Sequence, residues 1–274
     1  MRDVRLIAGA LLLALLALGG LLAPLAAAWF GHDPFTPDLF LRHQPGSAEH
    51  PLGTDDLGRD LLLRLLYGAR ISLAVGLATA VAAAMLGTAI GLLAAWRGGV
   101  LDAVLMRLAD GMLALPALPV LVVLAAADTG RIGLPRGEAV SDVVRIVAIL
   151  TVFGWVGVAR LARAAALSVL ARDYVRAARA LGAREARVLW RHVLPNIAGP
   201  VAVATALAVA GAILAESTLS FLGLGIAPPA ASWGNMLSNA QDLVFSAPWA
   251  AVWPGLAILL AVVGCTLVAD GLRR

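Results

Sequence analysis

Four uncharged runs of this sequence are each long enough to cross a lipid bilayer, and they constrain the fold more than any other feature. The runs cover residues 6–32, 71–96, 193–215 and 243–269. A transmembrane helix needs about 20 consecutive apolar residues, and each run exceeds that length. Hydrophobic residues make up 61% of the 274 residues and charged residues only 14%, a composition that a soluble core of this size does not accommodate. The sequence therefore predicts an all-α, polytopic membrane protein.

A weaker apolar run at residues 111–127 lies between the second and third of these strong runs. It reaches spanning length if its helix begins near Ala103. That start places Arg107 and Asp110 three residues apart near one membrane face, where the two side chains pair along the helix. We therefore expect one continuous helix as the third span.

Another weak run, at residues 146–159, needs flanking residues to reach spanning length. We expect its helix to extend from about residue 143 to residue 166, with Arg145 and Arg160 snorkelling toward opposite interfaces. Together with the four strong runs, the two weak runs give six transmembrane helices.

The first run begins close to the amino terminus and shares features with a secretory signal peptide. Arg2 and Arg5 precede the apolar stretch, and small residues occupy positions 26–28. The stretch is longer than the apolar core of a typical signal peptide. We therefore expect an uncleaved first span, with a cleaved signal as the alternative.

The distribution of arginine predicts how the spans are oriented, because the chain contains no lysine. With the amino terminus inside, the inner segments carry twice as many arginines as the outer segments, which hold most of the acidic residues. An excess of arginine marks the cytoplasmic side. We expect a multi-pass protein of the bacterial cytoplasmic (inner) membrane with both termini in the cytoplasm. The net charge of +4 then reflects topology and not nucleic-acid binding.

A basic segment between the fourth and fifth spans predicts two short amphipathic helices. The first has an apolar face and an arginine face at helical spacing. The residues on these faces are Leu170, Tyr174, Ala177, Ala178 and Leu181, and Arg172, Arg176 and Arg179. Gly182 is expected to end this helix, because glycine adopts the left-handed conformation of a helix terminus without a steric penalty.

The second amphipathic helix is expected to stop at Pro195, which has no amide proton to donate inside a helix. Its two faces again follow helical spacing. The apolar face contains Ala186, Leu189, Trp190, Val193 and Leu194, and the charged face contains Arg184, Arg187 and Arg191. Two helices with a glycine elbow form a candidate docking surface. The alternative is a charged face that is solvated or lies on the lipid surface.

This basic segment resembles the EAA loop of the transmembrane subunits of type I ABC importers. The matching positions are Ala177, Ala178, Gly182, Leu194 and Pro195. Arg176 stands where the family pattern has Glu and His192 where it has Ile, and both departures resemble the peptide branch of the family. The resemblance implies a loop that couples to ATPase subunits through Tyr174, Arg176, Ala177, Ala178, Gly182, Arg187, Leu194 and Pro195.

Two further parts of the sequence carry the same resemblance. Residues 50–60 and 68–73 resemble the segment that leads into the second span of the second permease of dipeptide, oligopeptide and nickel importers. Residues 216–225 and 232–234 resemble the fifth span and outer loop of the same subunit. The similarity extends from about residue 1 to residue 270 and implies the type I ABC importer permease fold.

The resemblance also implies a domain organisation. Residues 1–67 are expected to form an amino-terminal region with the first transmembrane helix and an outer loop. Residues 68–274 are expected to form the importer transmembrane domain, with a cytoplasmic coupling loop at residues 168–195.

The expected function is that of a permease subunit in a bacterial ATP-binding-cassette importer for dipeptides or oligopeptides, working by alternating access. The resemblance implies a homologous second permease subunit, two ATPase subunits and an extracytoplasmic solute-binding protein as partners. Nickel or another small solute is the alternative cargo. An ion-coupled secondary transporter would need ionisable relays or broken helices at the midplane, which the spans hardly offer. A membrane scaffold without transport activity gives no reason for the glycine elbow.

Glu216 is the one carboxylate inside an otherwise uncharged span. Carboxylates in membrane spans are costly and usually face a polar interior. Two interpretations stay open. Glu216 lines the pathway near the outer gate, or it is a structural partner of Arg70 or of a neighbouring subunit.

The outer segment after Glu216 is bounded by prolines at positions 228, 229 and 248. Trp233, Leu237, Gln241 and Val244 share one helical face in it. We expect a short helix in the outer interface, with Trp233 and Asn235 near the outer gate, and a packing lid without contact to the solute is the alternative.

No nucleotide-binding or catalytic motif is present, since the chain lacks both a P-loop and any lysine. We expect no enzyme activity and no cofactor on this chain, with ATP and Mg on the partner ATPase subunits. His32, His43 and His50 fall in the first outer loop, eleven and seven residues apart with no cysteine nearby. Because neutral loop histidines are common, we expect no metal site there.

Overall fold

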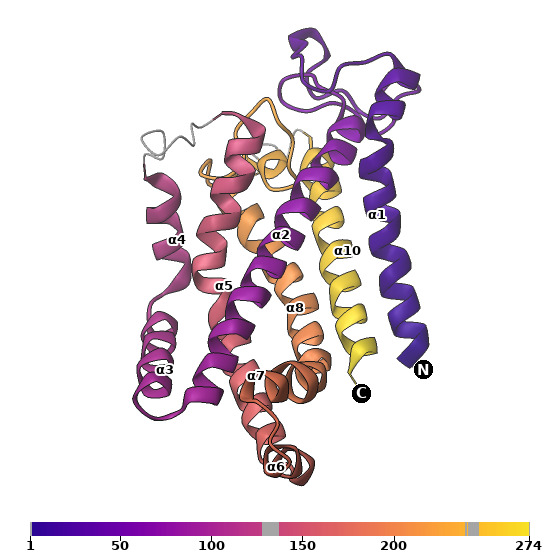
Figure 1. The fold of residues 1–274 in the computed structure, drawn as a ribbon. Helices are drawn as coiled ribbons and strands as arrows, with labels where there is room; N and C mark the ends of the chain where they lie inside the picture. Colours follow the sequence, from indigo (N-terminus) through magenta and orange to yellow (C-terminus); the bar gives the residue numbers. More distant parts are fainter. Residues whose placement is uncertain (1, 128–136, 239, 241–246, 274) are drawn as a thin grey trace.

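The computed structural model of the chain is a bundle of long helices with connecting segments at its two ends (Figure 1). It describes residues 2–127, 137–238, 240 and 247–273, and within these residues no β-strand forms. Five helical stretches are long and apolar enough to cross a membrane. They are α1 (Arg2–Phe30), α2 (Leu61–Arg97), α5 (Ala139–Leu170), the combined stretch Glu185–Phe221 and α10 (Trp249–Leu272).

A sixth crossing forms only if two shorter helices are counted as one span. Helix α3 (Gly99–Ala114) and helix α4 (Ala117–Ala126) are bent by 87° at the break between them. The prediction of a continuous third span is therefore wrong. The reason is Pro116, because a residue before proline avoids the helical conformation, and Leu115 has an extended backbone with a ψ of 138°.

Helix α3 is tied to α5 by ion pairs that the sequence did not predict. Arg163 on α5 binds Asp102 on α3. Asp110 on α3 lies 3.5 Å from Arg160 on α5. Asp110 thus pairs with Arg160, and the pair with Arg107 that was expected along the helix is not formed.

Glycines allow close helix packing at two contacts of the bundle. Helix α1 lies against α10, and a Cβ atom at Gly9 would come within 2.7 Å of the carbonyl oxygen of Gly264. Helix α2 lies between α5 and α8 (Leu194–Phe221), and a Cβ atom at Gly87 would come within 2.5 Å of the carbonyl oxygen of Trp155. Small residues let helix backbones approach closely, which is how membrane helices gain van der Waals contact.

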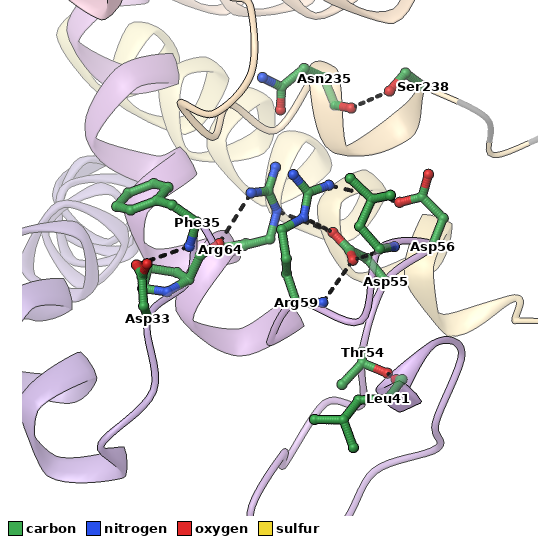
Figure 2. A network of polar contacts seen from close by, with 12 residues as sticks. Asp33, Phe35, Leu41, Thr54, Asp55, Asp56, Arg59, Arg64, Asn235 and Ser238 are labelled. Carbon is green, nitrogen blue, oxygen red and sulfur yellow. Dashed lines mark hydrogen bonds and ion pairs between the residues drawn. The ribbon is translucent and has the colours of Figure 1, made fainter. Parts of the chain in front are cut away.

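Buried ion pairs stabilise the conformation of the segment that precedes α2 (Figure 2). Nε of Arg59 donates to the carboxylate of Asp55 at 2.8 Å, and Nε of Arg64 lies 3.4 Å from the same carboxylate. The side chain of Asp60 accepts the amide proton of Leu63 at 2.8 Å and so caps the first turn of α2.

The two ends of the bundle differ in what they carry (Figure 1). One end holds the short helices between α5 and α8 together with the start of α1 and the end of α10. The opposite end holds the segment before α2 and the segment after α8. The candidate coupling loop and the candidate outer gate are therefore separated by the full length of the spans.

Candidate functional site

The glycine elbow that the sequence predicts is present between two short helices. Helix α6 (Asp173–Ala180) ends before Gly182, which has a φ of +82°, and helix α7 (Glu185–Val188) follows. A Cβ atom at Gly182 would meet no atom within 4 Å. Glycine is required here by the left-handed backbone and not by crowding.

The burial of α6 differs from the predicted apolar face. Within α6, all of which the structure describes, Val175 alone is buried, and it packs with Val188, Val193 and Ile197. Tyr174 is 46% exposed and Leu181 is 89% exposed. The burial of Val175 was not predicted, because a single valine between Tyr174 and Arg176 gives no periodic signal.

The exposed side of the elbow combines apolar and basic side chains. Its exposed members among the predicted coupling residues are Tyr174, Arg176, Ala177, Gly182 and Arg187, while Ala178 is half-buried. Arg176 lies 3.5 Å from Asp173, and both side chains are mostly solvent-exposed. The exposed side of the elbow therefore presents apolar and basic side chains that the described part of the chain does not cover.

Pro195 does not end the second helix, so that prediction is wrong. A π-helical turn at Leu189–Val193 connects α7 to α8, and Pro195 lies in the first turn of α8. Proline has no amide proton for an i→i−4 hydrogen bond, and the wider turn that precedes it lets the helix continue without that bond. At the same junction, the carbonyl oxygen of His192 accepts a hydrogen bond from Nδ2 of Asn196 at 2.6 Å. Leu194 is half-buried at the same junction.

The π-helical turn makes the coupling region continuous with a membrane span. Val188 and Val193 are fully buried against Ala162 and Ala166 of α5. The apolar face of the second predicted helix is only partly buried, since Trp190 is 73% exposed. A displacement of the elbow therefore moves the ends of α5 and α8 together.

Glu216 lies inside the opposite end of the bundle and is 0% exposed. One carboxyl oxygen accepts a hydrogen bond from Ser220 at 2.7 Å, and the other accepts one from Ser72 on α2 at 3.2 Å. Arg70 is exposed, and its guanidinium group lies 5.8 Å from the ring centre of Tyr67. An Arg70–Glu216 ion pair is therefore not formed.

Trp233 also points into the protein. It is 1% exposed, and its indole Nε1 donates to the carbonyl oxygen of Leu65 at 3.0 Å. Within the described residues of this segment, a 3-10 turn forms at Asn235–Leu237 and Ala240 is helical, while Gln241 and Val244 of the expected interfacial helix lie outside those residues.

Asn235 shapes the same outer segment through its side chain. Its amide nitrogen donates to the carbonyl oxygens of Ile226 at 3.1 Å and Ala230 at 2.8 Å, and its amide oxygen accepts the amide proton of Ser232 at 3.0 Å. The carbonyl oxygen of Asn235 accepts from the hydroxyl of Ser238 at 2.6 Å (Figure 2). Asn235 thus organises the loop in this conformation.

Two charged residues of α5, Asp142 and Arg145, hold the beginning of this outer segment. Arg145 is 3% exposed and does not snorkel, so that expectation is wrong. It lies 3.2 Å from Asp142 and donates to the carbonyl oxygens of Leu224 at 3.3 Å and Gly225 at 2.9 Å. Asp142 accepts the amide proton of Ala227 at 3.0 Å. The spacing of an acid and an arginine one helical turn apart was the available signal.

Two apolar grooves border α2. A groove of about 590 Å³ runs between α2 and the start of α8, and Met85, Leu92, Trp96, Trp190 and Val201 are among its lining residues. A second groove, of about 730 Å³, lies between α2, α3 and α5. Neither groove presents a charged side chain.

Two histidines of the first outer segment lie against each other, with the ring centres of His32 and His50 4.7 Å apart. In the part of the chain that the structure describes, no three His, Cys, Asp or Glu side chains form a group able to hold a metal ion. Nδ1 of His50 lies 2.8 Å from the carboxylate of Asp60, the capping residue of α2.

Comparison with known proteins gives one family. Residues 87–274 match the family described as binding-protein-dependent transport system inner membrane component. The match covers well over half of the chain, including the elbow and Glu216.

Similar proteins are found in several bacteria. The chain is 40% identical to the di/tripeptide transport system permease protein of Pseudomonas aeruginosa, over 97% of this chain and 85% of that protein. It is 36% identical to the oligopeptide transport system permease protein of Bacillus subtilis, over 97% and 82% of the two chains. It is 38% identical to the dipeptide transport system permease protein of Alkalihalophilus pseudofirmus, over 85% and 73%.

Proposed function

This chain belongs to the family of binding-protein-dependent transport system inner membrane components, and we propose that it is the permease subunit of an ATP-binding-cassette importer for dipeptides or oligopeptides. The relatives named above carry peptide transport in their names. The observation that carries the proposal is the exposed elbow of α6 and α7, which connects two membrane spans and leaves its apolar and basic face free.

The elbow is the proposed docking surface for an ATPase subunit. Tyr174 and Leu181 supply exposed apolar area, and the surrounding arginines supply charge that steers an acidic partner. The wide turn and the buried Val188 and Val193 make the elbow rigidly continuous with α5 and α8. ATP-driven closure of two ATPase subunits would be transmitted as rigid-body motion of these spans.

An importer of this kind also needs partners besides the ATPase subunits. A homologous second permease would complete the pathway, and a solute-binding protein would deliver peptide at the opposite end of the bundle. ATP and Mg would be held by the ATPase subunits, and this chain would bind no cofactor and perform no catalysis. Because both chain ends lie at the same end as the elbow (Figure 1), we place both termini in the cytoplasm of the bacterial inner membrane.

The test is reconstitution of this chain with its genomic neighbours in proteoliposomes. Uptake of labelled dipeptides and oligopeptides is compared with uptake of Ni²⁺ under the same conditions. We expect peptide uptake that requires ATP and the binding protein. The matched control is a complex carrying Tyr174→Asp, which changes one exposed side chain of α6 and should lose ATPase subunits. Peptide uptake that persists without ATP, or Ni²⁺ uptake alone, would refute the proposal.

A further inference from the structure

Two hydrogen-bond chains start at the backbone of the outer segment and converge on Glu216. The amide of Ile226 donates to the hydroxyl of Ser220 at 3.1 Å, and that hydroxyl donates to one carboxyl oxygen at 2.7 Å. The amide of Trp233 donates to the hydroxyl of Ser72 at 3.1 Å, and that hydroxyl donates to the other carboxyl oxygen at 3.2 Å. Two points of one loop are thus linked through a single side chain.

Both serine hydroxyls donate to residue 216, so each of the two oxygens of its side chain has to be an acceptor. Each serine hydroxyl accepts a backbone proton and has one proton of its own to donate. A glutamine at this position would keep one acceptor oxygen and replace the other by an amine group that donates. One serine would then be left with a buried hydroxyl proton and no acceptor, which is costly in a protein interior.

The segment held in this way packs tightly on α8. We define residues 224–235 as the outer strap. A Cβ atom at Gly234 would lie 2.5 Å from Cα of Ser217, and one at Gly225 would lie 2.6 Å from Cα of Ser220. The strap backbone therefore touches the same face of α8 that presents Glu216. The chain through Ser72 joins the strap and α8 to α2, whereas the chain through Ser220 lies on α8 alone, so a movement of α8 away from α2 breaks the first chain.

The beginning of the outer strap is also held by α5. Arg145 donates to the carbonyl oxygens of Leu224 and Gly225, and Asp142 accepts from the amide of Ala227. The strap is thus fixed to α2, α5 and α8 together at the end of the bundle opposite the elbow (Figure 1).

We propose that Glu216 is a positioning residue that keeps the outer strap closed over the outer end of the pathway, and that separation of α2 from α8 loosens the strap by breaking the chain through Ser72. The role of the strap as an outer gate rests on the proposed transport function. The role of Glu216 in holding the strap does not, because it follows from contacts within this chain.

The experiment measures how readily the outer strap opens. Ala231 is 1% exposed in the strap and accepts a cysteine with little change in volume. Ala231→Cys is introduced in a Cys265→Ala background, and the assembled complex in right-side-out spheroplasts is treated with a membrane-impermeant maleimide without solute. We expect slow labelling with Glu216 intact and labelling faster by about tenfold with Glu216→Gln, as the loss of one buried hydrogen bond implies.

Matched variants separate the hydrogen-bond chains from general loosening of α8. Ser72→Ala and Ser220→Ala each remove one link and should raise labelling, with little further increase when either is combined with Glu216→Gln, because they interrupt the same chains. Thr218→Val is the control, since its exposed hydroxyl donates to the carbonyl oxygen of Leu214 within α8. It should label like the parent.

Two outcomes would overturn the proposal. One is a parental labelling rate in Glu216→Gln, and the other is an equal increase in Thr218→Val. If Glu216→Gln fails to insert, the single serine variants decide the question, and parental rates in both reject it. Failure of peptide uptake by the parent complex would reject the proposed function and leave the labelling result interpretable.

Discussion

The guanidinium group of Arg179 lies 3.0 Å from the carboxylate of Glu185, on the other side of Gly182. The two side chains are 39% and 45% exposed, so the pair is worth well under about 1 kcal/mol. Its geometric effect is larger, because it joins the end of α6 to the start of α7 across the one left-handed residue of the elbow. The orientation of the docking surface thus depends on Gly182 and this contact together.

Replacement of Gly182 should test that dependence. Gly182→Val places a β-branched side chain at a φ of +82°, with strain of at least about 1 kcal/mol. We expect near-normal amounts in the membrane, reduced co-purification of the ATPase and little solute uptake. Gly157→Val on α5 is the control, because that glycine is helical and also has open space around it. Normal uptake and normal ATPase association in Gly182→Val would show that the loop is only a connector.

Val175 should control the attachment of α6 to the bundle. It is the buried residue of α6, and Val175→Ala should weaken local packing by about 1–3 kcal/mol. Hydrogen exchange should accelerate in α6 and remain unchanged in the centre of α5. Tyr174→Ala, at the neighbouring exposed position, should leave exchange unaltered while weakening ATPase binding. Equal exchange in both variants would mean that another contact holds α6.

The topology can be checked at two exposed positions. Single cysteines at Arg179 and Glu49, in a chain without Cys265, should react with an impermeant reagent from opposite sides of the membrane. The physical reason is the excess of arginine in the segments that share an end with α6. Labelling of both positions from the same side would contradict the docking proposal.

Arg145 should be among the most sensitive positions of the chain. Arg145→Leu leaves Asp142 buried at 0% exposure without its arginine, which should cost about 3–5 kcal/mol. Adding Asp142→Asn should recover part of that loss, because the uncompensated charge disappears. Thermal unfolding of the four proteins in a double-mutant cycle gives the coupling energy. Additive losses would show that the two side chains act independently.

Glu216→Gln should alter the rate of transport more than its selectivity. Glu216 is fully buried beneath the outer strap and contacts serines of its own chain, so it has no surface to offer a peptide in this conformation. Uptake of cationic, neutral and anionic dipeptides should fall by a similar factor. A switch in preferred peptide charge would place Glu216 in the pathway during transport.

Predictions from the sequence were wrong mainly for side chains whose hydrogen-bond partners lie far away in the sequence. Arg145 was expected at the interface because charged side chains in spans usually snorkel. The carbonyl oxygens that accept its hydrogen bonds belong to Leu224 and Gly225, about 80 residues further along the chain. No local sequence pattern predicts these contacts. The break at Pro116 is different, because an X-Pro bond inside an apolar run is a visible signal that was outweighed by the length of the run.

What the sequence determined by itself is the set of local properties: the membrane spans other than the broken third one, the position of the elbow at Gly182 and the basic side of the protein. The length of an apolar run, a glycine in the left-handed conformation and an excess of arginine each depend on residues that are close in the sequence. The sequence alone is therefore enough to predict them. Tertiary structure alone decided that Glu216 binds Ser72 and Ser220, that Trp233 turns inward and that Pro195 continues a helix. Burial and hydrogen bonding in a bundle depend on which helices meet, because a polar group there takes its partner from whichever neighbour the packing supplies.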